Sequence, residues 1–127
     1  MSAPDVGALA RDVAAEHADL AAVLAPLSEA DWSLPTPAPG WTIRDQVTHL
    51  AWFDRATVTA LTDPEAFAVL RDAALAQGPD FVDELARQEA GRRGAEAAAW
   101  WAEERARLVA ALARVDPWSG FPGSDRR

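Results

Sequence analysis

The stretch PGWTIRDQVTHLAWFDRATVTALTDP, residues 39–64, contains both the start and the stop signals of one helix. Thr42 is a good N-cap, and Asp45 takes the reciprocal position of a capping box. Mostly apolar side chains then recur at alternating steps of three and four residues, as in an amphipathic helix. Asp63 is a suitable cap for the next helix, and Pro64 suits its first position. The stretch therefore predicts a long amphipathic helix that is followed at once by another.

Helical spacing continues on both sides of this stretch, and no segment alternates with the period of a β-strand. Three long amphipathic helices and two short ones favour an all-α fold, an antiparallel helical bundle with left-handed packing. The expected helices cover residues 5–27, 42–62, 63–78, a short segment from about Pro79, and about 95–115.

Proline and glycine mark the breaks between these helices. The loop of residues 28–40 contains three prolines, and we expect Trp32 to attach it to the core. A chain of 127 residues is long enough to bury a core of its own. We expect one helical domain over residues 1–115 and an irregular C-terminal tail over residues 116–127.

Composition limits the functions of the chain. The net charge is −8, and all 12 basic residues are arginines that alternate with acids, so we expect no nucleic-acid partner. No apolar run reaches the ~20 residues of a membrane span, and no signal peptide pattern is present. We therefore expect a cytoplasmic protein with no membrane partner. The absence of cysteine excludes disulfides and a thiol nucleophile of the chain's own.

His49 is the first candidate for chemistry, because it borders the apolar stripe of its helix and faces a seam between helices. Asp45 precedes it by one turn, where a carboxylate can orient the imidazole or bind a metal itself. Asp54 lies on the stripe, so its charge requires a partner such as an arginine, a backbone N–H or a metal. His49 is either a metal ligand or a half-buried histidine with one hydrogen bond.

The only other histidine, His17, takes an apolar position on the first helix. It joins the metal-ligand candidates if that helix packs beside the second, and is otherwise a histidine at the bundle surface. The aromatic residues Trp41, Trp52 and Phe53 either line an apolar pocket or belong to the core. The segments AEERARL and GRRG favour a solvated helix face and an arginine pair at a helix end. No phosphate loop, nucleophile elbow or HExxH pattern is present, so no catalytic residue is assigned.

Residues 35–67, PTPAPGWTIRDQVTHLAWFDRATVTALTDPEAF, carry a resemblance to a known family. With its proline-rich loop, its GW before a capped helix, HLAWFDR and DPEAF, the chain resembles the metal-binding domain of actinobacterial mycothiol-dependent maleylpyruvate isomerase-like proteins, in the DinB-like superfamily. The resemblance implies a four-helix bundle that holds a divalent metal, typically zinc, with three side chains. His49 matches the ligand on the second helix. Relatives that are enzymes bring a thiol co-substrate, mycothiol, to the metal, which lowers the thiol pKa.

The chain departs from this family after ARVDPWSGFPG, where relatives continue into the fourth bundle helix. It ends in SDRR and has no histidine after His49, so the family's other two ligands, an acid and a histidine on that helix, are missing. We expect either a fragment of a longer protein or a natural truncation. The groove left by the missing helix is expected to hold a second copy, the chain's own tail with Trp118 and Phe121, or a partner.

Two functions follow from these residues and the resemblance. The first is a divalent-metal-binding DinB-like domain with an incomplete or degenerate site and a small-molecule thiol or substrate as partner. In it His49 is the ligand, and His17, Asp45 and Asp54 are weaker candidates. The alternative is a non-catalytic helical interaction module that oligomerises, as a homodimer, through the groove of the missing helix. The missing ligands leave open whether the chain is an enzyme.

Overall fold

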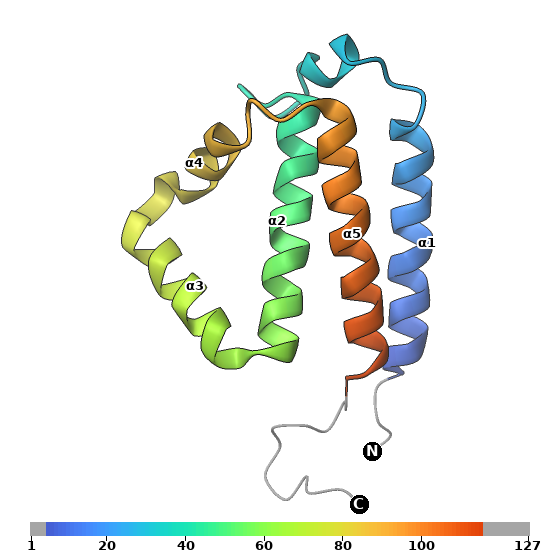
Figure 1. The fold of residues 1–127 in the computed structure, drawn as a ribbon, viewed down its shortest axis with the longest axis vertical. Helices are drawn as coiled ribbons and strands as arrows, with labels where there is room; N and C mark the ends of the chain where they lie inside the picture. The colour runs from blue at the N-terminus through green and yellow to red at the C-terminus, as the bar shows by residue number, and fades with distance from the viewer. Residues whose placement is uncertain (1–4, 116–127) are drawn as a thin grey trace, which may run out of the picture.

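Three long helices lie side by side and two shorter helices project from them (Figure 1). The structure, a computed structural model, describes residues 5–115, so the expected tail of residues 116–127 lies outside the described residues. Within residues 5–115 there is no β-strand, only one isolated bridge between Pro35 and Thr42. The all-α prediction is confirmed. The elements are α1 (Val6–Leu24), η1 (Ala30–Ser33), α2 (Ile43–Thr62), α3 (Pro64–Gln77), η2 (Gly78–Asp80), α4 (Phe81–Gln88) and α5 (Gly94–Ala113).

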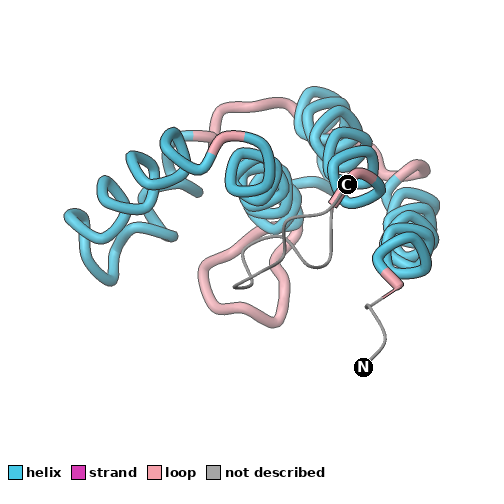
Figure 2. The backbone as a smooth tube through the Cα atoms, turned by 90° about the horizontal axis from the view of Figure 1, so that it is seen from below, coloured by secondary structure: helices cyan, strands magenta, loops and turns pink. Residues whose placement is uncertain are grey.

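The course of the chain makes α5 the centre of the bundle. Figure 1 shows α1 running opposite to α2 and α5, which share one direction because α3 and α4 return the chain to its starting end. α5 packs against both α1 and α2, whereas α3 and α4 pack on α2. Figure 2 shows the same arrangement from below, with α3 and α4 set to one side of α2. The side of α2 that faces α3 and α4 is therefore separate from the side that faces α5.

Local signals set the ends of α2 and α3 as the sequence predicts. The backbone N–H of Thr42 donates to Asp45 at 2.9 Å, and the N–H of Asp45 donates to the Thr42 hydroxyl at 3.2 Å, which completes the capping box. Asp63 then accepts from the backbone N–H of Ala66 at 3.2 Å and caps α3. Gly78 ends α3 with a φ of +73°, a conformation that favours glycine.

The core lies between α2, α5 and the loop that precedes α2. Trp101 and Trp32 are 2% and 4% exposed, which confirms that Trp32 attaches the loop to the core. Ala51 on α2 and Ala97 on α5 are fully buried, and side chains this small allow the two helices to approach closely. None of the helices in residues 5–115 combines the length and the hydrophobicity that a bilayer span requires.

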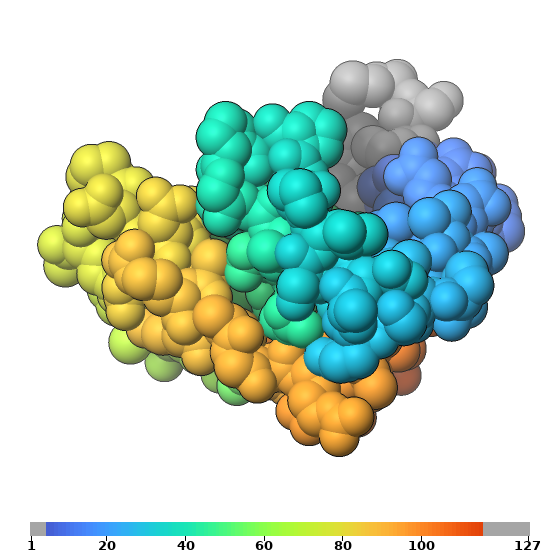
Figure 3. Space-filling view, turned by 90° about the horizontal axis from the view of Figure 1, so that it is seen from above, coloured from blue at the N-terminus to red at the C-terminus, as the bar shows by residue number. Residues whose placement is uncertain are grey.

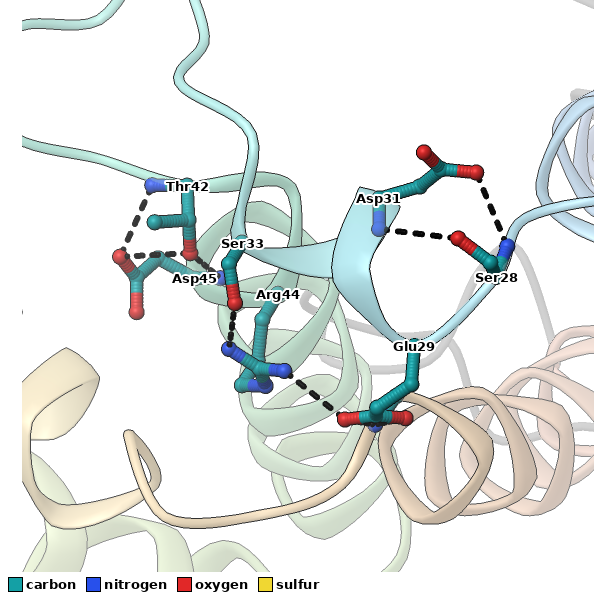
Figure 4. A network of polar contacts seen from close by, with 8 residues as sticks. Ser28, Glu29, Asp31, Ser33, Thr42, Arg44 and Asp45 are labelled. Atoms are coloured by element: carbon teal, nitrogen blue, oxygen red, sulfur yellow. Dashed lines mark hydrogen bonds and ion pairs between the residues drawn. The ribbon is translucent and has the colours of Figure 1, made fainter.

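A carboxylate from the loop after α1 anchors the start of α5. The backbone N–H of Gly94 donates to both carboxylate oxygens of Glu29, at 3.0 and 2.9 Å. Arg44 pairs with Glu29 at 3.0 Å and donates to the Ser33 hydroxyl at 3.1 Å (Figure 4). The Gly94 N–H, followed by Arg44, lowers the pKa of Glu29. Figure 3 shows the cyan loop segment lying on the orange start of α5 at this end of the molecule.

Candidate functional site

His49 packs between two aromatic side chains, Trp41 from the loop before α2 and Phe53 one turn later on α2. Its ring centroid is 5.3 Å from that of Trp41 and 4.4 Å from that of Phe53. Its Nδ1 atom is buried and has no hydrogen-bond partner among the described residues. Burial lowers the pKa of His49, so the imidazole is neutral at neutral pH, the form that binds metals.

Asp45 takes part in the helix cap rather than in a contact with the Nδ1 of His49. One of its carboxylate oxygens accepts from both the backbone N–H and the hydroxyl of Thr42, at 2.9 and 3.0 Å. Since the Nδ1 of His49 has no partner, Asp45 does not orient the ring through that atom. The sequence places the two residues one turn apart, and the cap explains why an acid stands at this position.

Asp54 and His17 come together elsewhere, around Trp101. The Nε1–H of Trp101 donates to Asp54 at 3.2 Å. The His17 ring stands edge-on to Trp101, with centroids 5.7 Å apart, and its Nδ1 is also buried without a partner among the described residues. The partner that Asp54 requires is therefore an indole N–H, donated from α5.

Burial raises the pKa of Asp54, and its neighbours only partly oppose this effect. The charge of His17 and the hydrogen bond from Trp101 lower the pKa, Glu104 raises it, and Arg105 lowers it. Near neutral pH, where the carboxyl group is ionised, its partial burial thus disfavours the folded state.

Asp54→Asn is expected to be at least as stable as the wild type at pH 7, because the amide oxygen still accepts from Trp101 without a buried charge. The pKa of Asp54 is raised in the folded state, so the free energy of unfolding of the wild type increases as the pH falls and the carboxyl group takes up a proton. The difference in stability between the wild type and Asp54→Asn therefore becomes smaller toward low pH. Thermal melts of both proteins between pH 7 and pH 4 measure it. Asp54→Ala is the control and should be less stable than Asp54→Asn throughout, since it leaves the indole N–H unpaired. If the difference in melting temperature between Asp54→Asn and the wild type grew toward low pH, the charge of Asp54 would not destabilise the folded protein.

Glu104 is a buried acid that the sequence analysis missed. The prediction of a solvated face for AEERARL is wrong for this residue, which is 4% exposed and pairs with Arg107 at 2.8 Å. Arg105 of the same segment lies over the Trp101 ring, 4.4 Å from its centroid. The spacing of Glu104 from Trp101 and Leu108, three and four residues, was the signal that places it on the inner face.

The three aromatic residues named from the sequence line two different hollows. Trp52 and Phe53 line a groove between α2, α3 and α4. Trp41 lines a separate hollow beside Asp83, to which its Nε1–H donates at 3.3 Å. In GRRG, Arg92 pairs with Glu89 at 2.9 Å and stacks over Trp100, as a helix-end arginine does.

The candidate ligands therefore fall into two separate pairs. His49 and Asp45 lie toward the start of α2, and His17 and Asp54 lie around Trp101. Within residues 5–115, no three His, Cys, Asp or Glu side chains stand close enough to hold a metal ion together.

The chain matches one protein family over most of its length. The family described as the mycothiol maleylpyruvate isomerase N-terminal domain matches residues 13–124. Uncharacterized proteins of two Mycobacterium tuberculosis strains, H37Rv and CDC 1551, are each 42% identical over 125 residues, covering 94% of this chain and 49% of their own length. The chain thus spans about half the length of these curated relatives. No solved structure matches it significantly. The resemblance seen in the sequence is confirmed: the chain belongs to the family of the mycothiol maleylpyruvate isomerase N-terminal domain.

Proposed function

We propose that this chain supplies one ligand, His49, and the aromatic wall around it to a divalent-metal site that works with a thiol. The observation that carries the proposal is the buried Nδ1 of His49, which has no partner among residues 5–115. A buried polar atom without a partner costs free energy, and a bound group would offset that cost. A neutral imidazole is the commonest metal ligand in proteins.

The fit of the described residues to a metal is partial. His49 has the burial and the neutral form that a ligand needs, but no further ligating side chains join it within residues 5–115. A zinc site requires three or four ligands. The remaining ligands would therefore come from chain outside the described residues or from a second copy. The curated relatives are about twice as long as this chain.

The family name points to mycothiol as the thiol. A divalent metal at this position would lower the pKa of a thiol that enters the site and so favour the nucleophilic thiolate. These 127 residues contain no cysteine, so they supply no thiol themselves, and in the proposed site mycothiol would supply it. Trp41 and Phe53 would cover the His49 ring and exclude water from it.

The test is zinc binding by the metal-free chain and two single variants. We expect His49→Ala to weaken zinc binding by at least about tenfold, because it removes the ligand. His17→Ala is the matched control, since it removes the other imidazole from a different helix, and should bind zinc as the wild type does. Titration calorimetry gives the affinities, and the molar mass with and without zinc shows whether two copies share the ion.

Equal zinc affinities of the wild type and His49→Ala would overturn the proposal. A dimer that forms without zinc, and that His49→Ala leaves unchanged, would instead favour the non-catalytic interaction module. Zinc-dependent dimerisation that requires His49 would support a site completed by a second copy.

A further inference from the structure

A hydrophobic groove of about 420 Å³ lies between α2, α3 and α4, on the side of α2 away from the core. Its walls include Trp52 and Phe53 from α2, Phe67 and Leu70 from α3, and Phe81 at the start of α4. A groove of this size is in the range that holds a small organic molecule.

The aromatic side chains of this groove support one another. Trp52 packs edge-on against Phe53 and Phe81, with ring centroids 4.9 and 5.2 Å apart. Yet α3 contributes no fully buried side chain, and Leu75, on the groove, is 72% exposed. The groove thus combines a preformed aromatic wall with apolar surface that stays open to solvent, which is typical of a binding site.

Arg71 is the one charged side chain that lines the groove among the described residues. Its ion pair with Asp72 spans 3.3 Å between neighbours that are 55% and 68% exposed, and a pair so exposed holds its partners weakly. The guanidinium is therefore available to a ligand, and its planar fork matches a carboxylate. Because the net charge of the chain is −8, an anion is not attracted to the protein as a whole, and its binding in the groove would depend on Arg71.

We propose that this groove binds a small molecule with a flat hydrophobic body and one carboxylate group. The body lies against Trp52, Phe67 and Phe81, and the carboxylate pairs with Arg71. The proposal goes beyond the metal-site function and does not depend on it, because none of these residues is a candidate metal ligand. Phe53 touches both the groove and His49, so the two sites are neighbours.

The probe is 2-naphthoate, a flat aromatic carboxylate, and its neutral counterpart is 2-naphthamide. In an NMR titration of the isotope-labelled chain we expect saturable shifts on α2, α3 and α4, with naphthoate binding about fivefold more tightly than naphthamide, the effect of one exposed charged contact. Arg71→Gln should abolish this preference and leave naphthamide binding unchanged. Ala74→Phe, which fills the groove, should weaken both ligands. Arg11→Gln, an exposed arginine on α1, is the matched control and should behave as the wild type.

Three results would overturn the proposal. The first is the absence of saturable binding of naphthoate to the wild type. The second is a naphthoate preference that survives Arg71→Gln, a surface substitution that should leave the fold intact. The third is a dimer that shifts the NMR signals of the groove residues and that naphthoate does not dissociate. The occupant of the groove would then be a second copy of the chain.

Discussion

Gly94→Ala is expected to destabilise the domain by about 3 kcal/mol or more, at the upper end of the cost of overpacking a core. A Cβ at this position would overlap the indole of Trp32, lying 2.6 Å from Cδ2 and closer still to Cγ and Cδ1. Neither side can move easily, because Trp32 is 4% exposed and the Gly94 backbone is bound to Glu29. Urea denaturation measures the loss, which corresponds to a fall in melting temperature of about 10 °C or more for a domain of this size.

Gly91→Ala is the matched control, three residues earlier, in the connection between α4 and α5. A Cβ at Gly91 meets no atom within 4 Å. We expect this variant to equal the wild type or to gain up to about 1 kcal/mol, because alanine restricts the unfolded chain. If the two alanine variants were equally stable, Trp32 would not occupy the space beside Gly94 in solution.

Trp101→Ala is expected to lower the free energy of unfolding by about 3–5 kcal/mol, the range typical of replacing a fully buried tryptophan by alanine. Trp101 is 2% exposed and joins α5 to the other two long helices through its hydrogen bond to Asp54 and its contact with His17. Its removal leaves a cavity at the junction of three helices and an unpaired carboxylate at Asp54. The measurement is urea denaturation followed by far-ultraviolet circular dichroism.

Trp100→Ala is the control for this substitution, because Trp100 is its neighbour on α5 but is only partly buried and stacks on Arg92. We expect Trp100→Ala to lower the free energy of unfolding by about 1 kcal/mol, because it removes a partly exposed ring and one stacking contact. Trp101→Phe separates the two effects, since it keeps most of the ring volume and removes the N–H. A larger loss at Trp100 than at Trp101 would contradict the packing of α5 described above.

The candidate site was predictable from the sequence only in part. The capping box follows from residues within one helix, and the structure contains it. The ring contacts of His49 with Trp41 and Phe53 were not part of the prediction. The meeting of Asp54 with Trp101 spans 47 residues and could not be read from either helix alone. Glu104 was missed because its segment is rich in charge, which hides the helical spacing that turns it inward.

The sequence by itself determined where α2 and α3 begin and end, and most of the apolar face of each long helix. These features depend on interactions within one turn, such as those of Thr42 with Asp45 and of Asp63 with the chain that follows it. Periodicity and capping are local properties, so they can be read in the order of the chain. The expected end of the first helix at residue 27 was wrong, because α1 stops at Leu24, ahead of Pro26.

Only the tertiary structure decided which side chains meet. It brought Glu29 to the N–H of Gly94, 65 residues later, and it placed His17 beside Trp101 while His49 lies between Trp41 and Phe53. The rotation of each helix and the choice of its neighbour depend on how all the apolar faces pack at once. That packing leaves the imidazole of His49 buried without a polar partner among the described residues.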